Sequence, residues 1–420
     1  MYRYTHLPLV LGLAAAAASA SAQTDPVGSS QLRPVVPPQA APLAPLQAPP
    51  VAPPTVQWNR AAAGDLLNYI ERIDEEGLNP ADYNPDRLRA AVASKDADQL
   101  NAVATEAFLR VSSDLALGHV RGDARVSWYI NDTDLNGGEQ YAMMERAVRD
   151  GSVAGTLTAL LPTHPQYGEL KAVLATTPKS EKAQIEKIRT NMDRWRWLPR
   201  DLGQKYVIVN VPAYMVALVE NGRVLARRRA VAGAVKTATP QLSTTISGVI
   251  FNPWWEVPQS ITPEVRGKKG YVAVKDEAGK IIRYRQPPGA SNALGRMKLV
   301  MPNDHAIFLH DTNVKGLFDK QARAYSHGCI RTEDALGFAQ TLLEPTGQWD
   351  KAAIQQTIAS GKTVKADLAA PIPVYITYFT AAAISEKSEI IAYSDIYGRD
   401  KPVVTALNGT APAKTKMASK

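Results

Sequence analysis

The sequence contains one cysteine, Cys329, in 420 residues. A single cysteine excludes an intramolecular disulfide framework, a zinc ribbon and an iron–sulfur cluster held by this chain alone. Long apolar runs are also missing after the first 22 residues, so we expect no transmembrane helix in the rest of the chain. The remaining composition, 45% apolar and 21% charged, is typical of a globular protein, and the length favours two domains.

Residues 1–22 have the three parts of a cleavable secretory signal peptide. Arg3 and His6 stand near the start, residues 7–18 are mostly apolar, and Ala20-Ser21-Ala22 fits a cleavage site. The apolar run is too short to span a bilayer, and an apolar helix of the mature fold is the alternative. We therefore expect export to the periplasm and no integral membrane segment after cleavage. The one thiol would then enter an oxidising compartment, where an unpaired thiol needs a functional reason.

Proline and positive charge are unevenly used. Many of the 30 prolines fall in residues 23–56, which we predict to be a Pro-rich disordered linker in an extended form. A ligand for a proline-recognising domain is the alternative for this segment. The formal net charge of +8 favours an anionic polymer as a neighbour, and charge by itself would also permit nucleic acid.

Helical spacing of apolar residues dominates residues 57–178. Leu66, Leu67 and Ile70 recur at three- and four-residue spacing, and further helices are predicted over Pro85–Ala93 and Ala97–Leu117. No phosphate-binding loop, metal-ligand spacing or internal repeat accompanies them, so we predict a helical scaffold domain. Residues 179–203 predict a connecting Trp-rich helix that ends before a proline.

Residues 204–400 change to a period of two, which is typical of strands. Asn221-Gly222 between two apolar runs predicts a type I′ hairpin. One clear helix is predicted in this half, over Glu333–Leu343, with Thr332 as its N-cap. The fold class is therefore α+β, a helical scaffold domain plus a mostly β, sandwich-like domain with one helix after Cys329. Residues 401–420 are predicted to be a flexible tail.

One stretch carries residues suited to covalent chemistry. His310 ends a predicted strand, and Ser326-His327-Gly328-Cys329-Ile330-Arg331 begins sixteen residues later. A free thiol has a pKa of about 8.5, so a nucleophilic cysteine needs a base such as an imidazole. Gly328 permits a tight turn in which the amides of Gly328 and Cys329 could face an oxyanion. Arg331 could hold a substrate carboxylate in bidentate fashion.

Three alternatives for this stretch remain open. Cys329 could be a buried small hydrophobic residue, although its polar neighbours argue against an apolar site. His310, His327 and Cys329 could bind zinc with a water as the fourth ligand. A redox-sensing thiol is the third alternative, but the chain offers no resolving cysteine. We expect neither a metal nor another cofactor.

His310 together with Ser326-His327-Gly328-Cys329-Ile330-Arg331 closely resembles the signature of the L,D-transpeptidase catalytic (YkuD-type) domain. The similarity to the large periplasmic, YcbB-type subgroup extends over residues 58–400, with matching segments at 195–199, 251–258, 285–289, 292–295 and 397–400. The helical block resembles the scaffold domain of that subgroup. Two features depart from it: we find no peptidoglycan-binding module before the Trp-rich helix, and the lid insertion, about residues 258–284, is short.

The resemblance implies a peptidoglycan L,D-transpeptidase. Cys329 would attack the amide between the L-centre of a diamino acid and the terminal D-alanine of a donor tetrapeptide stem, leaving a thioester. His310 would be the base, oriented by the backbone carbonyl of Asp311, and an amine of a neighbouring stem would complete a 3→3 cross-link. Acylation of Cys329 by carbapenems is a corollary. The remaining residues implied for the substrate are Tyr325, Ser326, His327, Arg331 and Asn292.

Other functions stay open from the sequence. The same acyl-enzyme could react with water, a D-amino acid or a protein amine, and the acceptor is not encoded in the motif. A non-enzymatic cell-wall-binding protein, acting through the helical block, is a further alternative. Peptidoglycan stem peptides are the expected partner, nucleic acid is not, and the sequence identifies no protein partner.

Overall fold

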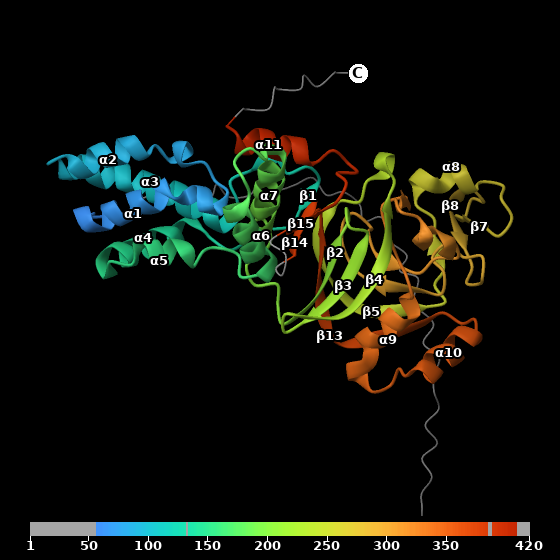
Figure 1. Cartoon of the computed structure of the whole chain (residues 1–420). Helices are drawn as coiled ribbons and strands as arrows, with labels where there is room; N and C mark the ends of the chain where they lie inside the picture. Colours follow the sequence, from blue (N-terminus) through green and yellow to red (C-terminus); the bar gives the residue numbers. More distant parts are fainter. Residues whose placement is uncertain (1–55, 132, 385–388, 410–420) are drawn as a thin grey trace, which may run out of the picture. The chain divides into compact units, whose positions relative to one another are not determined.

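The computed structural model describes residues 56–131, 133–384 and 389–409. The predicted signal peptide, almost all of the Pro-rich linker and the last eleven residues lie outside this part of the chain. Within the described residues, none of the helices combines the length and apolar character needed to cross a membrane. The first part of the fold is helical and the second is rich in strands, which confirms the predicted α+β class (Figure 1).

The helices of the first part begin where the sequence offers caps. The Asn59 side chain accepts a hydrogen bond from Ala62 N at the start of α1, and Asp96 caps α3 in the same way. The predicted helices Pro85–Ala93 and Ala97–Leu117 are observed with the same bounds. The helices of this part are α1 (Arg60–Glu71), α2 (Pro85–Ala93), α3 (Ala97–Leu117), α4 (Gly137–Asp150), α5 (Val153–Thr158), α6 (Pro165–Thr176) and α7 (Lys182–Trp195), with 3-10 turns η1 (Ile73–Glu76), η2 (Pro80–Tyr83) and η3 (Gly122–Ala124).

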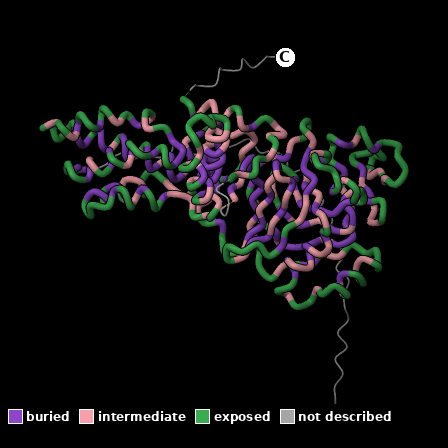
Figure 2. The backbone as a smooth tube through the Cα atoms, viewed as in Figure 1, coloured by how far each residue is buried: buried purple, intermediate pink, exposed green. Residues whose placement is uncertain are grey.

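The apolar stripes of α1 to α5 enclose one core, which Figure 2 shows as buried segments between exposed outer turns. Leu66, Ile70 and Phe108 are completely buried in it. The core also includes Val403 and Leu407 of a helix at the far end of the chain, α11 (Asp400–Leu407). This corrects the prediction of a flexible tail from residue 401, because an apolar face two turns long is buried against the helical part.

Buried charges hold the end of α7 in place. Asp193 accepts hydrogen bonds from the backbone amides of His119 and Val120, at 2.7 and 3.1 Å, and from the Trp197 indole at 2.9 Å. It also lies 3.4 Å from the guanidinium of Arg196, and both side chains are fully buried. The Trp-rich turn after α7 is therefore fixed by charge-assisted hydrogen bonds as well as by aromatic packing.

The strands of the second part form a mixed sheet that closes on itself. Its order is β1-β5-β13-β2-β3-β4-β12-β10-β9, and β9 pairs back to β5. The expected sandwich-like packing thus takes the form of a closed sheet around one core. Its strands are β1 (Trp128–Tyr129), β2 (Lys205–Asn210), β3 (Met215–Glu220), β4 (Arg223–Gly233), β5 (Gln241–Phe251), β9 (Met297–Val300), β10 (Leu309–His310), β11 (Ala324–Ser326), β12 (Ile330–Thr332) and β13 (Val364–Thr377).

Two connections show how the sequence sets this topology. Asn221 and Gly222 have φ values of 50° and 74° between the paired residues Glu220 and Arg223, as the predicted type I′ hairpin requires. The short strand β1 comes from the helical part and pairs in parallel with the start of β5. The sheet therefore includes residues from both halves of the chain.

The helix after the cysteine motif differs from the prediction in two respects. Asp334, rather than Thr332, caps it, so the helix is α9 (Ala335–Leu343), and Glu333 lies outside it. A further helix, α10 (Lys351–Ala359), follows, where we had predicted one helix only. Thr332 belongs to β12, because its backbone continues the strand pairing with β4.

Residues near the predicted lid form a small sheet of their own. The order is β6-β8-β7, from β6 (Trp255–Glu256), β7 (Val272–Lys275) and β8 (Ile281–Gln286), and the short helix α8 (Thr262–Val265) lies within this segment. A separate hairpin, β14 (Ala381–Ile384) and β15 (Glu389–Ala392), follows β13. Figure 1 shows α8, β7 and β8 grouped beyond the strands of the main sheet.

Candidate active site

Strand register brings His310 and the cysteine motif together. β10 and β12 are parallel neighbours in which His310 lies opposite Arg331. Cys329 directly precedes β12, in the bend that leads into this strand. The charge of Arg331 acts on both His310 and Cys329, consistent with this placement. The sequence separation of nearly twenty residues is thus closed by one strand pairing.

His310 is a buried neutral base with a fixed orientation. Its ring Nδ1 donates to the backbone carbonyl of Asp311 in a short hydrogen bond, because a carbonyl can only accept. The proton is therefore on Nδ1, and Nε2 carries the lone pair. Burial, the positive charge of Arg331 and, to a smaller extent, that of Lys298 lower the pKa of His310 to about 3.

Asp311 is itself held firmly. Its backbone N–H donates to Met297 O at 2.9 Å, and its carboxylate accepts from Arg296 N at 2.8 Å and from the Lys315 ammonium. Gly295 makes room for this carboxylate, since a Cβ there would lie 2.4 Å from Asp311 Oδ2. The side chain of Asp311 thus anchors the backbone whose carbonyl orients His310.

Cys329 is partly buried, and its thiol is protonated at rest. The Sγ atom lies 3.5 Å from the backbone carbonyl of Ala306, to which it can donate. Burial raises the pKa of the thiol to about 11, although the Phe308 backbone, Lys298 and Arg331 all act to lower it. The thiol is therefore not activated in the free protein, because loss of hydration outweighs the nearby positive charges.

The turn before Cys329 is fixed by side-chain hydrogen bonds. Ser326 Oγ donates to Cys329 O at 2.5 Å and accepts from Gly328 N at 3.1 Å, and Thr239 Oγ1 donates to Gly328 O at 2.8 Å. Gly328 has a φ of 118°, which other residues rarely adopt. Because its N–H is already bonded to Ser326, only the Cys329 N–H, of the two amides we predicted for an oxyanion, has no acceptor among the described residues.

Three predicted substrate residues lie in different surroundings. The His327 ring contacts α8, with its Nε2 3.1 Å from Glu264 Oε1. Tyr325 is 49% exposed on β11. Asn292 is completely buried, and its amide donates to the carbonyls of Pro253, Gln286 and Pro287. Asn292 therefore fixes a loop and offers no surface to a substrate, unlike the prediction.

Lys298 belongs to this site and was missed from the sequence. It lies opposite His310 on β9, in an antiparallel pair, and its Nζ is 5.2 Å from the centre of the Phe308 ring. The only available signal was strand alternation, which places Lys298 among apolar neighbours without showing which face it takes. The pairing of β9 with β10, a tertiary feature, decides that face.

The zinc alternative gains no support from the geometry. The Nδ1 atom of His310 is bonded to Asp311 O, and His327 is directed at Glu264. Within the residues that the structure describes, no three His, Cys, Asp or Glu side chains are grouped so that they could hold a metal ion. The thiol of Cys329 is free, because it is the one cysteine of the sequence.

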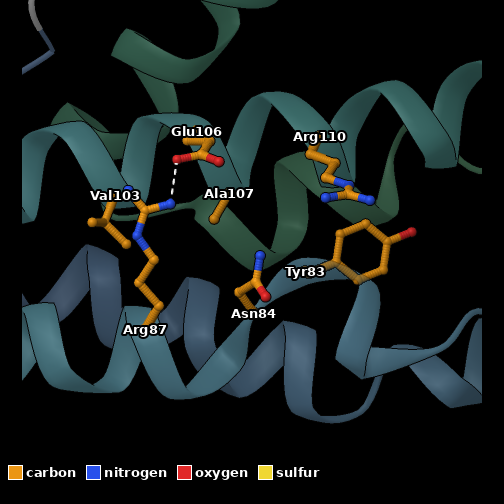
Figure 3. Close-up of a pocket in the computed structure, with 7 residues that line it drawn as sticks. All are labelled: Tyr83, Asn84, Arg87, Val103, Glu106, Ala107 and Arg110. Carbon is orange, nitrogen blue, oxygen red and sulfur yellow. Dashed lines mark hydrogen bonds and ion pairs between the residues drawn. The ribbon is translucent and has the colours of Figure 1, made fainter.

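A separate hollow in the helical part is too small for a substrate. Figure 3 shows it between η2, α2 and α3, with Arg87 bonded to Glu106 and Arg110 above the Tyr83 ring. Its volume is about 20 Å³, which is room for about one water molecule. Arg87 is paired with Glu106 and the Tyr83 hydroxyl with Asp114, and we assign this small hollow no chemistry.

Two family models match this chain. Residues 204–373 match the family described as the L,D-transpeptidase catalytic domain, and residues 55–174 match the one described as the scaffold domain. A Haemophilus influenzae protein named "Putative L,D-transpeptidase" is 30% identical over an alignment of 253 residues, and the match covers 54% of this chain and 50% of that relative. This chain thus spans about half the length of the relative it matches.

Solved structures give weaker similarity. A mutant L,D-transpeptidase from Enterococcus faecium is 14% identical, with a TM-score of 0.24 over 43% of this chain and 52% of its own. An L,D-transpeptidase from Mycobacterium smegmatis is 12% identical, with a TM-score of 0.23 over 41% of this chain and 58% of its own. Similarity at this level carries no argument about the site.

Proposed function

Since residues 204–373 form an L,D-transpeptidase catalytic domain and residues 55–174 a scaffold domain, we propose that this protein forms 3→3 cross-links in peptidoglycan. The observation that carries the proposal is the strand pairing that sets His310, a neutral imidazole, opposite Arg331 of the motif that contains the lone thiol. The predicted signal peptide and the wall substrate together favour action in the periplasm.

The first half-reaction acylates Cys329. Nε2 of His310 takes the thiol proton as Sγ attacks the carbonyl between the diamino acid and the terminal D-alanine. The Cys329 N–H is placed to stabilise the oxyanion, a contribution of about 3 kcal/mol in other acyl transfers. The S–C bond forms, the C–N bond breaks, and the protonated imidazole returns its proton to the leaving D-alanine amine.

The second half-reaction transfers the acyl group. An amine of a neighbouring stem attacks the thioester carbonyl, so that a C–N bond forms and the S–C bond breaks. His310 takes a proton from that amine and passes it to the departing sulfur, which restores the thiol and the neutral imidazole. Because the resting thiol has a raised pKa, thiolate forms only when His310 accepts the proton in the bound complex. This keeps the nucleophile weakly reactive toward electrophiles that do not occupy the donor site.

The test is mass spectrometry of muropeptides after purified protein acts on peptidoglycan rich in tetrapeptides. Wild type is expected to release D-alanine and yield 3→3 dimers, whereas Cys329→Ala should yield neither. Tripeptides without dimers would instead identify water as the acceptor, and dimers made by Cys329→Ala would contradict the proposal. Carbapenem treatment gives an independent readout, an intact-mass adduct confined to proteins that retain Cys329.

A further inference from the structure

Lys298 is a partly buried cation without an ion-pair partner. Burial lowers the pKa of its ammonium, and no carboxylate lies within 4 Å of it in the part of the chain that the structure describes. Glu256, the acidic residue whose charge acts on Lys298, is instead paired with Arg283 at 3.4 Å. A cation that has lost part of its hydration without gaining a counter-charge raises the free energy of the folded protein.

Arg331, which lies opposite His310 on the other neighbouring strand, is also a partly buried cation without an ion-pair partner among the described residues. Its Nε is buried without a hydrogen-bond partner, and burial lowers the pKa of its guanidinium. No ion pair within 4 Å involves Arg331 among residues 56–131, 133–384 and 389–409. Lys298, His310 and Arg331 are register partners in one row across β9, β10 and β12. Two unpaired cations thus flank the base from both neighbouring strands.

The resting thiol does not supply the missing anion. Cys329 is protonated and directed toward Ala306 O, so it leaves both cations without a negative partner. The Phe308 ring lies under the Lys298 ammonium and packs edge-on against His310 at 5.6 Å, which keeps the long side chain over the site. A bound anion would offset the desolvation of both cations at once.

We propose that Lys298 and Arg331 together bind a substrate carboxylate beside the amide that Cys329 attacks, and that Lys298 thereby selects donors carrying that carboxylate. This inference rests on the proposed function, because the donor stem supplies the ligand. Two sources share the chemistry, the carboxylate of the terminal D-alanine and the second carboxylate of the diamino acid. Lys298 is a specificity-determining residue in this scheme and takes no proton.

The test measures donor binding without turnover. Cys329→Ala protein is titrated calorimetrically with the free tetrapeptide and with peptides amidated at either carboxylate, with and without Lys298→Met. Lys298→Met keeps the apolar stem and removes the charge, and it should weaken binding of the free tetrapeptide at least about tenfold. One of the two amidated peptides should bind both proteins equally, which identifies the carboxylate. Lys298→Arg should restore most of the affinity.

A matched control is Lys351→Met, which removes an exposed charge at the start of α10, outside the site. It should leave all three affinities unchanged. An equal loss on all three peptides from Lys298→Met, no loss on any of them, or no binding of any peptide would overturn the inference. The proposed function is judged separately, by acylation of the wild-type Cys329 with the free tetrapeptide followed by intact mass. Selective binding without acylation would contradict the proposed function and still support the proposed carboxylate site.

Discussion

Arg331 lies directly opposite His310 across the parallel strands β12 and β10, and its charge helps to keep that imidazole neutral. The same guanidinium lowers the pKa of Cys329, but burial of the thiol has the larger effect. Nucleophile and base are therefore both uncharged at rest. An ion pair between them would have to form in the presence of substrate.

The raised thiol pKa predicts slow alkylation of the free protein. With a pKa of about 11, Cys329 should react with iodoacetamide at pH 8 on the order of a hundredfold more slowly than an unperturbed thiol. The rate should keep rising until the pH reaches about 11. Intact-mass time courses measure it cleanly, because the chain has one cysteine and the urea-unfolded protein serves as the control. A plateau already at pH 8 would contradict the burial argument.

The lowered pKa of His310 predicts loss of stability in acid. Below the ordinary histidine pKa of about 6.5 the unfolded chain binds a proton that the folded protein does not bind until about pH 3. The free energy of unfolding should therefore fall as the pH drops through this window, by about 1.4 kcal/mol per pH unit for this one group.

Urea titrations of His310→Gln between pH 4 and pH 6.5 check this expectation. The variant should show a pH slope that is smaller by one proton. Burial also lowers the pKa of His164, to about 4. His164→Gln is therefore a second test, because it should likewise reduce the dependence of the free energy of unfolding on pH. Equal slopes for wild type and His310→Gln would show that the imidazole is not held neutral by the fold.

Asp193→Ala should be strongly destabilising without touching the site. The substitution leaves the fully buried Arg196 without its carboxylate and removes the acceptor of three further hydrogen bonds. Breaking a buried pair on one side typically costs about 3–5 kcal/mol. Chemical denaturation measures the lost free energy of unfolding. Glu76→Gln, at another buried acidic residue, is the comparison. A change below about 1 kcal/mol would mean that water replaces the carboxylate.

Gly295→Ala should impair acylation while the protein stays folded. Its φ is 64°, and the added Cβ would displace the Asp311 carboxylate and approach Thr312 N within 2.6 Å. The shift would move the carbonyl that orients His310, and we expect acylation of Cys329 to slow at least about tenfold. Gly316→Ala is the matched control, because nothing lies within 4 Å of a Cβ there. Equal acylation rates for the two variants would show that the position of Asp311 does not control the orientation of His310.

Local sequence signals predicted the parts of this protein that depend on near neighbours. The bounds of α2 and α3 follow from Asn, Asp and Pro at their starts, and Asn221-Gly222 specified its hairpin. The cysteine motif was visible for the same reason, since its turn is built within a few residues. These are the features for which short-range hydrogen bonds and backbone preferences decide the structure.

Features that depend on distant pairing were not predictable in this way. Lys298 enters the site only through the register of β9 with β10, and the thiol pKa depends on burial by several strands. Asn292 resembled a substrate contact, but its amide is used by three carbonyls of its own loop. The pattern of apolar residues specifies which face is buried and leaves open what lies opposite.

The packing of α11 has a consequence for the order of synthesis. Val403 and Leu407 complete a core that otherwise consists of residues before 200, and Arg194 of α7 is paired with Asp400 at 2.7 Å. The ribosome therefore makes the first half of the protein without the last pieces of its core. A nascent chain cut short before residue 400 should keep this core open and accessible to proteases. Folding of the helical core is therefore complete only after residues 403 and 407 have been synthesised.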